Sequence, residues 1–327
     1  MEVNDCKKDS ILVLGKGKLA YSVAACLLQA GHPVTLFSKK KNNALENINL
    51  HFTDLLESSP EYSKRGRLKI TNILDSKLDY KLTIAISNED LLEKKAIICQ
   101  LEERMPSDSI IAINTESIPL STLQNNCNYP ERIIGVNWVE PAHTTYFLEL
   151  IANSNTNKAL ANHLFHLAKA YWNKDPYIIY SDLGIRARMF VAMVREAFYL
   201  VENGYASIED IDKACRNDAG YYLPFAGNFR YMDLMGTYGY GMVMQDLNPE
   251  LSKERNIPVF FKDIITQGGL GMENNKGFYK YEKGDVEKWN KIFRKFSYQI
   301  QSIINKYPFN YKDKGLESKK SDQNRNR

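Results

Sequence analysis

The sequence predicts an α/β protein with a doubly wound, parallel sheet, followed by an all-α C-terminal domain. Three observations support this fold class. Short apolar segments alternate with segments of helical periodicity over the first half of the chain, which is the pattern of strands and helices in an open parallel sheet. A glycine-rich turn separates the first expected strand from the first helix. From about Asp182 onward the strand signal fades and helical periodicity continues.

The first expected strand is Ile11–Leu14, an apolar run that ends at Gly15. Apolar residues then recur at helical spacing over Lys18–Ala30, and Gly31 is expected to end this helix. The next strand is expected at Val34–Phe37. Strand, helix and strand within about 30 residues make a βαβ unit.

Further strands and helices follow the same alternation. A helix is expected at Asp90–Arg104, whereas the charged segment Pro60–Asp79 has a weak pattern and predicts no element. The remaining strands are short apolar runs expected at Leu82–Ile86, Ser109–Ile113, Ile133–Val136 and Phe147–Leu150.

The second half of the chain predicts helices alone. Arg186–Asn203 has strong helical periodicity, and the sequence SIED at Ser207–Asp210 is a capping box that begins another helix. We therefore expect a nucleotide-binding domain at residues 1–182, a helical domain at 183–306, and a disordered polar tail at 307–327.

Composition excludes several classes of protein. The 327 residues carry a net charge of only +4, which by itself indicates neither nucleic acid nor a membrane as partner. No apolar run reaches the roughly 20 residues that span a bilayer, and the first residues lack the apolar segment of a signal peptide. Five scattered cysteines favour reduced thiols and a cytoplasmic location. The histidines form no metal-ligand pattern, so no metal is expected.

The turn after the first strand carries the chemistry of a dinucleotide site. Gly15, Gly17 and Ala20 form the pattern G-x-G-x-x-A. The first glycine permits the tight turn, the second lets the backbone approach a pyrophosphate, and the small third residue allows close helix–strand packing. The following helix begins near Lys18 and directs unpaired N–H groups toward the phosphates. This context predicts a Rossmann-type nucleotide-binding domain.

The end of the second strand leaves the form of the cofactor open. An NAD site usually has an acidic residue there to accept hydrogen bonds from the ribose, but this chain has Ser38, followed by Lys39, Lys40 and Lys41. These residues could neutralise the 2′-phosphate of NADP. Alternatively, the lysines form a solvated turn and cofactor binding is weakened or lost.

Several segments resemble the 3-hydroxyacyl-CoA dehydrogenase family, including its gulonate dehydrogenase relatives. The resemblance covers most of the chain, from Ile11 to about Tyr281. The segments that carry it, in order, are EDLLEKK (Glu89–Lys95), IAINTESIPL (Ile111–Leu120), RIIGVNWVEPAHTTYFLELI (Arg132–Ile151), REAFYLVENGYASIEDIDKACRNDAGY (Arg195–Tyr221) and GGLGMENNKGFYKY (Gly268–Tyr281).

The resemblance implies an oxidoreductase that moves a hydride between a nicotinamide cofactor and a 3-hydroxy substrate, as in fatty acid metabolism. In the family a histidine is the general base and a glutamate orients it. The histidine position is Asn137 in this chain, the substrate-binding serine position is Glu116, and the substrate-binding asparagine position falls near Ala187. Only the orienting acid, Glu149, agrees.

Other groups are considered as replacements for the missing histidine. His143 lies six residues beyond Asn137. Glu116, Glu140 and Glu149 could form a carboxylate cluster in which one pKa is raised, or they could be unrelated glutamates. The resemblance also places Glu89 and Asn114 in the cofactor site, with NAD as the expected cofactor and NADP as an alternative.

Two functions remain open from the sequence. The first is a dehydrogenase of this family with an altered catalytic set, acting on a small-molecule substrate. The second is an inactive relative that keeps the fold and serves as a nucleotide-binding, scaffolding or regulatory protein. The aromatic-rich run Gly220–Met244 is expected to pack the helical domain and to contribute to a homodimer, as the resemblance implies.

Overall fold

The computed structural model describes residues 8–58 and 66–309. The chain divides into two compact units, which we describe separately. The first comprises Met1–Ala192 together with Phe293–Ser297, and the second comprises Met193–Ile292 together with Tyr298–Arg327. Most of the expected tail at 307–327 lies outside the described residues.

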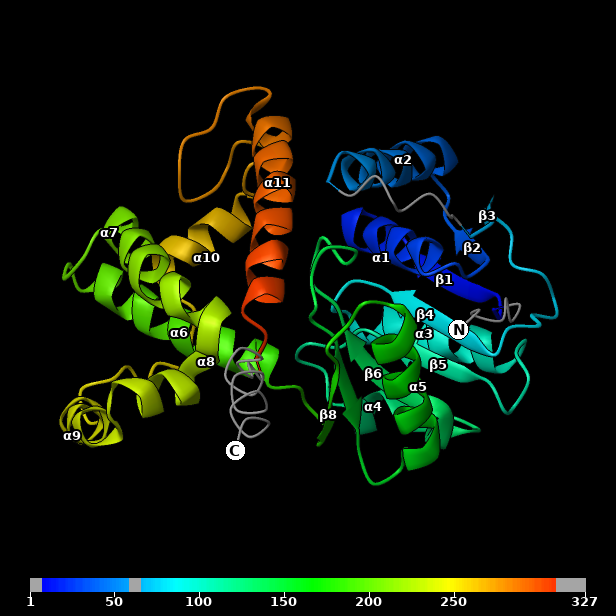
Figure 1. Ribbon diagram of the computed structural model, residues 1–327, viewed down its shortest axis with the longest axis horizontal. Coiled ribbons are helices and arrows are strands. Elements are labelled where there is room, and N and C mark those ends of the chain that lie inside the picture. The colour runs from blue at the N-terminus through cyan, green and yellow to red at the C-terminus, as the bar shows by residue number, and fades with distance from the viewer. Residues whose placement is uncertain (1–7, 59–65, 310–327) are drawn as a thin grey trace, which may run out of the picture. The chain divides into compact units, whose positions relative to one another are not determined.

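The first unit contains an eight-stranded sheet with the strand order β3-β2-β1-β4-β5-β6-β7-β8 (Figure 1). All neighbouring strands run parallel except β6 and β7, which are antiparallel. This arrangement confirms the predicted fold class. The strands are β1 (Ile11–Gly15), β2 (Val34–Phe37), β3 (Leu68–Thr71), β4 (Leu82–Ile86), β5 (Ile110–Ile113), β6 (Ile133–Asn137), β7 (Glu149–Ala152) and β8 (Tyr177–Tyr180).

Burial follows the position of each strand in the sheet. Every residue of the central β4 is buried, which explains its largely apolar sequence LTIAI. Leu12 of β1, Ile111 of β5 and Ile133 of β6 share one face of the sheet and contribute to a common core with Ile98 from a helix. The alternate residues of each strand point to the other face.

Helices cover the sheet between the strands. Nine residues of α1 are buried, so this helix is apolar around most of its surface. The helices of this unit are α1 (Lys18–Gln29), α2 (Lys41–Ser58), α3 (Leu91–Glu102), α4 (Leu120–Gln124), the 3₁₀ turn η1 (Pro130–Arg132) and α5 (Lys158–Tyr171).

The helix α6 (Arg186–Glu202) leads into the second unit, which is helical as expected. The predicted capping box at α7 is confirmed, because Ser207 Oγ accepts from the backbone N–H of Asp210 and the Asp210 carboxylate accepts from the N–H of Ser207. The other helices are α7 (Ile208–Ala214), the π-helical turn η2 (Cys215–Ala219), α8 (Gly220–Met235), α9 (Thr237–Leu247), α10 (Val259–Thr266) and α11 (Asp285–Lys306).

The structure also contains elements that the sequence did not indicate. Strand β3 lies within the segment Pro60–Asp79, for which no element was expected. The expected strand Phe147–Leu150 begins later, at Glu149, because pairing with β6 starts where Glu149 meets Asn137. Helix α2 and strand β8 were not expected.

Candidate functional site

The turn between β1 and α1 has the geometry of a phosphate-binding cradle. A Cβ atom on Gly15 would lie 2.7 Å from the carbonyl oxygen of Ile86 and 3.0 Å from the Cβ of Ala20, so β1, β4 and α1 approach too closely for a side chain there. Gly17 has a φ of +90°, and a Cβ atom at this position would meet nothing within 4 Å. The open side of Gly17 therefore leaves room for a pyrophosphate beside the first N–H groups of α1.

Ser38 follows β2 at the same edge of the sheet. Its backbone N–H donates to the carbonyl of Thr71 at 2.8 Å, and its Oγ accepts from the N–H of Lys40 at 3.3 Å. The side chain of Ser38 is buried, whereas Lys39, Lys40 and Lys41 are exposed. An uncharged hydroxyl thus stands where an NAD site usually has a carboxylate.

Glu89 ties the loop after β4 to the loop after β5. Its Oε1 accepts from the backbone N–H groups of Glu116, Ser117 and Ile118 at 2.9, 2.7 and 2.9 Å, and its Oε2 lies 3.2 Å from the buried Nζ of Lys94. Burial alone would raise the pKa of Glu89, but these N–H groups and Lys94 outweigh it and hold the pKa below its ordinary value. Glu89 therefore remains a carboxylate that shapes this edge.

Asn114 joins the same two loops and is also close to Lys94. Its Oδ1 accepts from the N–H of Ser87 at 2.9 Å, and its Nδ2 donates to the carbonyl of Ser87 at 3.0 Å. The Nζ of Lys94 donates to the backbone carbonyl of Asn114 at 2.6 Å. Glu89 and Asn114, which were both predicted to bind the cofactor, thus lie close together. They hold the loop after β4 and the loop after β5 against each other.

Asn137 is buried at the end of β6, and both ends of its amide are engaged. Its Oδ1 accepts from the N–H of Thr115 at 2.9 Å, and its Nδ2 donates to the carbonyl of Thr115 at 2.8 Å. The same Nδ2 donates to Oε1 of Glu149 at 3.0 Å. An amide held in this way has no site to accept a proton, so Asn137 cannot be a general base.

Glu149 lies opposite Asn137 in the β6–β7 register and opposite Tyr177 in the β7–β8 register. Its Oε2 accepts from the hydroxyl of Tyr177 at 3.1 Å and from the N–H groups of Ile185 and Arg186 at 2.8 and 3.2 Å. Burial, reinforced by this carboxylate, raises the pKa of Tyr177. Glu149 is thus a fully buried acceptor that joins three strands to the start of α6.

Gly184 shows how closely the chain before α6 passes Glu149. A Cβ atom on Gly184 would lie 1.9 Å from Oε1 of the Glu149 side chain. Only glycine fits there while the carboxylate keeps its place. Arg186, two residues later, then extends to Glu116, and the two form an ion pair with 2.6 Å between Nη1 and Oε1.

Glu116 differs from Glu149 because one of its two carboxylate oxygens accepts no hydrogen bond from the described residues. Its Oε1 is paired with Arg186, whereas its Oε2 is buried and has no hydrogen-bond partner among the residues that the structure describes. The side chain of Glu116 is partly exposed, next to Thr115, which holds Asn137. Glu116 therefore has one buried carboxylate oxygen whose hydrogen-bonding capacity is unused within the described part of the chain.

His143 does not join this group. It is buried in the loop between β6 and β7, where its ring lies against the ring of His51 from α2, with 4.5 Å between the centroids. Burial first, and then the neighbouring His51, Lys174 and Arg294, lower the pKa of His143 well below its ordinary value.

The two buried histidines predict acid sensitivity. Burial, followed by Arg294, lowers the pKa of His51 from 6.5 to about 4. Because the unfolded chain binds the proton more tightly, the free energy of unfolding is at its full value above pH 6.5 and falls as the pH drops toward 4. The loss should be on the order of 3 kcal/mol. Urea unfolding of wild type and His51→Gln between pH 4 and 6.5 checks this prediction. If the free energy of unfolding falls equally steeply with pH in both proteins, the prediction is wrong.

Tyr177 and Arg186 belong to this site, but the sequence did not indicate them. Tyr177 could have been found if the run YIIY had been identified as a strand, because its first residue then pairs with Glu149. Arg186 reaches Glu116 across 70 residues, and no local pattern indicates that contact.

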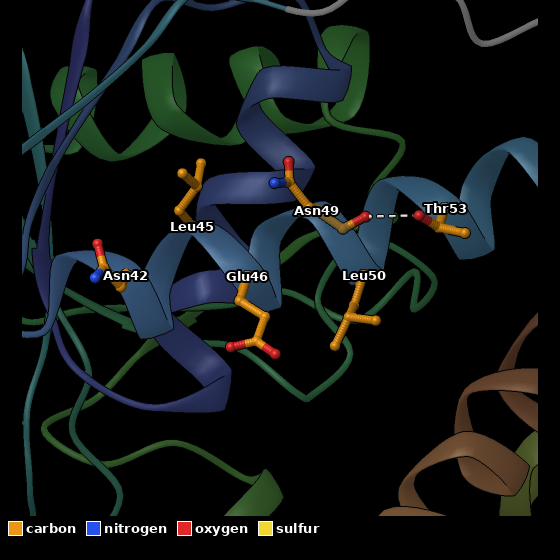
Figure 2. A pocket seen from close by; sticks show the side chains of 6 residues that line it. All are labelled: Asn42, Leu45, Glu46, Asn49, Leu50 and Thr53. Carbon is orange, nitrogen blue, oxygen red and sulfur yellow. Dashed lines mark hydrogen bonds between the residues drawn. The ribbon is translucent and has the colours of Figure 1, made fainter.

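A surface hollow of about 460 Å³ lies elsewhere, along the exposed face of α2 (Figure 2). Figure 2 shows Thr53 bonded to the backbone of Asn49 within this helix. The hollow contains none of the predicted site residues; its lining residues are Asn42, Leu45, Glu46, Asn49, Leu50 and Thr53. Within residues 8–58 and 66–309, no cluster of three or more His, Cys, Asp or Glu side chains could hold a metal ion.

Comparison with protein families decides the identity of the fold. Residues 10–182 match the NAD-binding domain of 3-hydroxyacyl-CoA dehydrogenase, and residues 185–281 match the C-terminal domain of the same family. The chain belongs to the 3-hydroxyacyl-CoA dehydrogenase family. The cradle of Gly15, Gly17 and Ala20 is therefore part of an NAD-binding domain, and the family consists of NAD-dependent oxidoreductases that act on CH–OH groups.

Individual relatives share about a quarter of the sequence. The chain is 26% identical to a 3-hydroxybutyryl-CoA dehydrogenase of Clostridioides difficile over 84% of its own length and 99% of the relative. It is 24% identical to 5-formyl-3-hydroxy-2-methylpyridine 4-carboxylate 5-dehydrogenase of Mesorhizobium japonicum over 83% of its own length and 90% of the relative.

Solved structures agree on the fold. A 5-formyl-3-hydroxy-2-methylpyridine 4-carboxylic acid 5-dehydrogenase, described as an NAD⁺-dependent dismutase, superposes with a TM-score of 0.84 at 22% identity, covering 91% of this chain and 98% of that one. FadB2 of M. tuberculosis gives a TM-score of 0.66 at 24% identity, covering 83% and 98%.

Among the residues that the structure describes, no helix is both long enough and apolar enough to cross a bilayer.

Proposed function

We propose that this protein is a nicotinamide-dependent dehydrogenase of 3-hydroxy substrates, either an acyl-CoA or a free hydroxy acid, in which Glu116 replaces the imidazole base. The observation that carries the proposal is the unpartnered Oε2 of Glu116 beside a fully hydrogen-bonded Asn137. In this proposal the unused lone pairs of the buried Oε2 accept the proton of a substrate hydroxyl that enters at this edge and contacts that oxygen directly.

The other residues of the site have positioning roles in this proposal. Gly15 and Gly17 would hold the pyrophosphate of the dinucleotide, which when bound would supply hydride transfer to or from the substrate carbon. Arg186 holds the Glu116 carboxylate through its Oε1. Glu149 fixes the backbone of Arg186 and the amide of Asn137. The hydroxyl proton of the substrate then passes to Oε2 of Glu116.

A second candidate function is favoured by Asn137 itself. Its amide makes a closed pair of hydrogen bonds with Thr115, which suits a structural residue better than a catalytic one. The protein would then bind the dinucleotide without chemistry and act as a scaffold or regulator. The two candidates differ in whether any turnover depends on Glu116.

Glu116→Gln separates these candidates. If Glu116 is the base, kcat with 3-hydroxybutyryl-CoA or 3-hydroxybutyrate and a nicotinamide cofactor should fall by about 10²-fold or more. Cofactor binding, followed by nicotinamide fluorescence, should be unchanged. Glu131→Gln, at an exposed position on η1, is the matched control. Measurable turnover that Glu116→Gln leaves unaltered would eliminate Glu116 as the base, and cofactor binding without turnover would support the second candidate.

We also propose a homodimer formed through the helical unit. Three aromatic side chains in the run Gly220–Met244 are more than four-fifths exposed in the single chain: Tyr221, Phe229 and Tyr238. Apolar exposure on this scale is typical of surfaces covered by a partner. Sedimentation of the full chain would reveal the expected two-fold mass.

A cytoplasmic location is part of the proposal as well. The four described cysteines are not paired in disulfides: Cys26, Cys99, Cys127 and Cys215. Such thiols suit a reducing compartment.

A further inference from the structure

We propose that the nucleotide site prefers NADP(H) to NAD(H), with Ser38 and the lysines that follow it as the specificity-determining residues. This inference rests on the proposed function, since it requires a dinucleotide in the cradle. It concerns the adenosine ribose, which a dinucleotide fold places at the carboxyl end of the second strand.

Ser38 removes the group that would select NAD. An acidic side chain at this position accepts hydrogen bonds from both ribose hydroxyls and repels a 2′-phosphate. Ser38 is neutral and 2% exposed, and its Oγ already accepts from the N–H of Lys40 at 3.3 Å. Its hydroxyl hydrogen can still be donated, and a phosphate oxygen is a stronger acceptor for it than a ribose hydroxyl.

The charged residues near Ser38 in the sequence are all positive. Between Ser10 and Leu45 the chain carries five lysines and no Asp or Glu, and the lysines are Lys16, Lys18, Lys39, Lys40 and Lys41. Two of them flank Gly17 in the cradle, and three follow Ser38. A phosphate monoester carries a charge of about −1.5 to −2 at neutral pH. The segment between Ser10 and Leu45, which contains the cradle and the end of β2, therefore supplies cations and no carboxylate.

The lysines after Ser38 are also available. Lys39, Lys40 and Lys41 are exposed, and none of the ion pairs formed by the described residues involves them. Asp9 and Glu46 are the nearest acidic residues along the chain, and neither is paired with these lysines. A solvated lysine turn alone would indicate little. Its combination with a buried, uncharged Ser38 at the ribose position is what favours a 2′-phosphate.

Titration of the full chain with NADH and NADPH, followed by nicotinamide fluorescence, tests the inference without relying on turnover. We expect the Kd for NADPH to be at least about tenfold lower than that for NADH at low salt. The difference should shrink at 0.5 M salt, where the screening length falls to about 4 Å.

Variants assign the preference to residues. Lys39→Ala/Lys40→Ala should weaken NADPH binding by about tenfold and leave NADH binding within about twofold, and Ser38→Asp should reverse the preference. Lys158→Ala/Lys169→Ala removes the same charge from α5, which packs on β7 and β8 at the far edge of the sheet, and should change neither Kd. Circular dichroism confirms that each variant is folded.

The outcomes distinguish this inference from the proposed function. NADH binding as tight as NADPH binding, or an NADPH preference that Lys39→Ala/Lys40→Ala leaves intact, would overturn the inference and leave a working dinucleotide site. Binding of neither dinucleotide up to about millimolar concentration, roughly −4 kcal/mol, would overturn the proposed function together with it.

Discussion

Replacing Glu149 with alanine is expected to lower the free energy of unfolding by about 3–5 kcal/mol. The carboxylate is fully buried and accepts hydrogen bonds from the Asn137 amide, the Tyr177 hydroxyl, and the N–H groups of Ile185 and Arg186. The last two N–H groups belong to the start of α6 and have no partner within that helix. Alanine would remove the acceptor of all four groups, leave Asn137 with Thr115 as its remaining acceptor, and open a cavity among three strands.

Urea unfolding of wild type, Glu149→Ala and Glu149→Gln measures this effect. Glutamine keeps one acceptor oxygen but places an NH₂ group against donors. The free energy of unfolding of Glu149→Gln should therefore lie between those of wild type and Glu149→Ala. Glu131→Ala, on the exposed surface of η1, should change stability by no more than about 0.5 kcal/mol. A loss below about 1 kcal/mol for Glu149→Ala would show that the carboxylate is not the acceptor on which this junction depends.

The strands that the sequence predicted share a physical property, which is burial. All five residues of β4 are buried, so a largely apolar run identified it. The edge strand β3 has partly buried and exposed residues with the sequence LKIT, and β8 has the sequence YIIY with no fully buried residue. Edge strands face solvent on one side and need less apolar sequence, so periodicity does not identify them.

The residues of the candidate site also differ in how far the sequence predicts them. The cradle was predictable because Gly15, Gly17 and Ala20 are close in sequence and each has a local backbone reason. Asn137 and Glu149 were predicted only through family resemblance, and their contact follows from the antiparallel β6–β7 register.

Local sequence patterns could not predict the contacts of Tyr177 and Arg186, because the residues in contact are far apart in the sequence. Tyr177 reaches Glu149 across 28 residues, and Arg186 reaches Glu116 across 70. Such contacts depend on strand order and on where α6 begins, and neither property is encoded in a short motif. His143, by contrast, was close to Asn137 in sequence but packs against His51 of α2.

Asn137→His is expected to raise kcat/KM for a 3-hydroxy substrate by about 10²-fold or more. The acid that would orient an imidazole is already in place, because Oε1 of Glu149 lies 3.0 Å from Nδ2 of Asn137. A histidine could donate one ring N–H to this carboxylate and keep the other nitrogen as the acceptor. A new acidic limb, with a pKa near 6–7, should then appear in the pH profile of kcat/KM.

The substitution has a structural cost that can be measured separately. Asn137 now satisfies both the N–H and the carbonyl of Thr115, and a histidine cannot replace both bonds. We expect a loss of about 1–3 kcal/mol in the free energy of unfolding. Asn137→Ala breaks the same bonds without supplying a base, so it should be destabilised without gaining activity, and it is the matched control.

Double variants test whether the gain in kcat/KM comes from an imidazole base that Glu149 orients. Asn137→His/Glu149→Gln should lose most of the new activity, since glutamine does not favour the imidazolium that forms during proton transfer. Asn137→His/Glu116→Gln should lose less than Glu116→Gln does in the wild-type background, because the proton then passes to the imidazole. If Asn137→His is folded, binds the dinucleotide and shows no gain, the missing histidine is not what limits turnover. The substrate site itself would then have been lost, and a binding or regulatory role would account for the intact cradle geometry at Gly15 and Gly17.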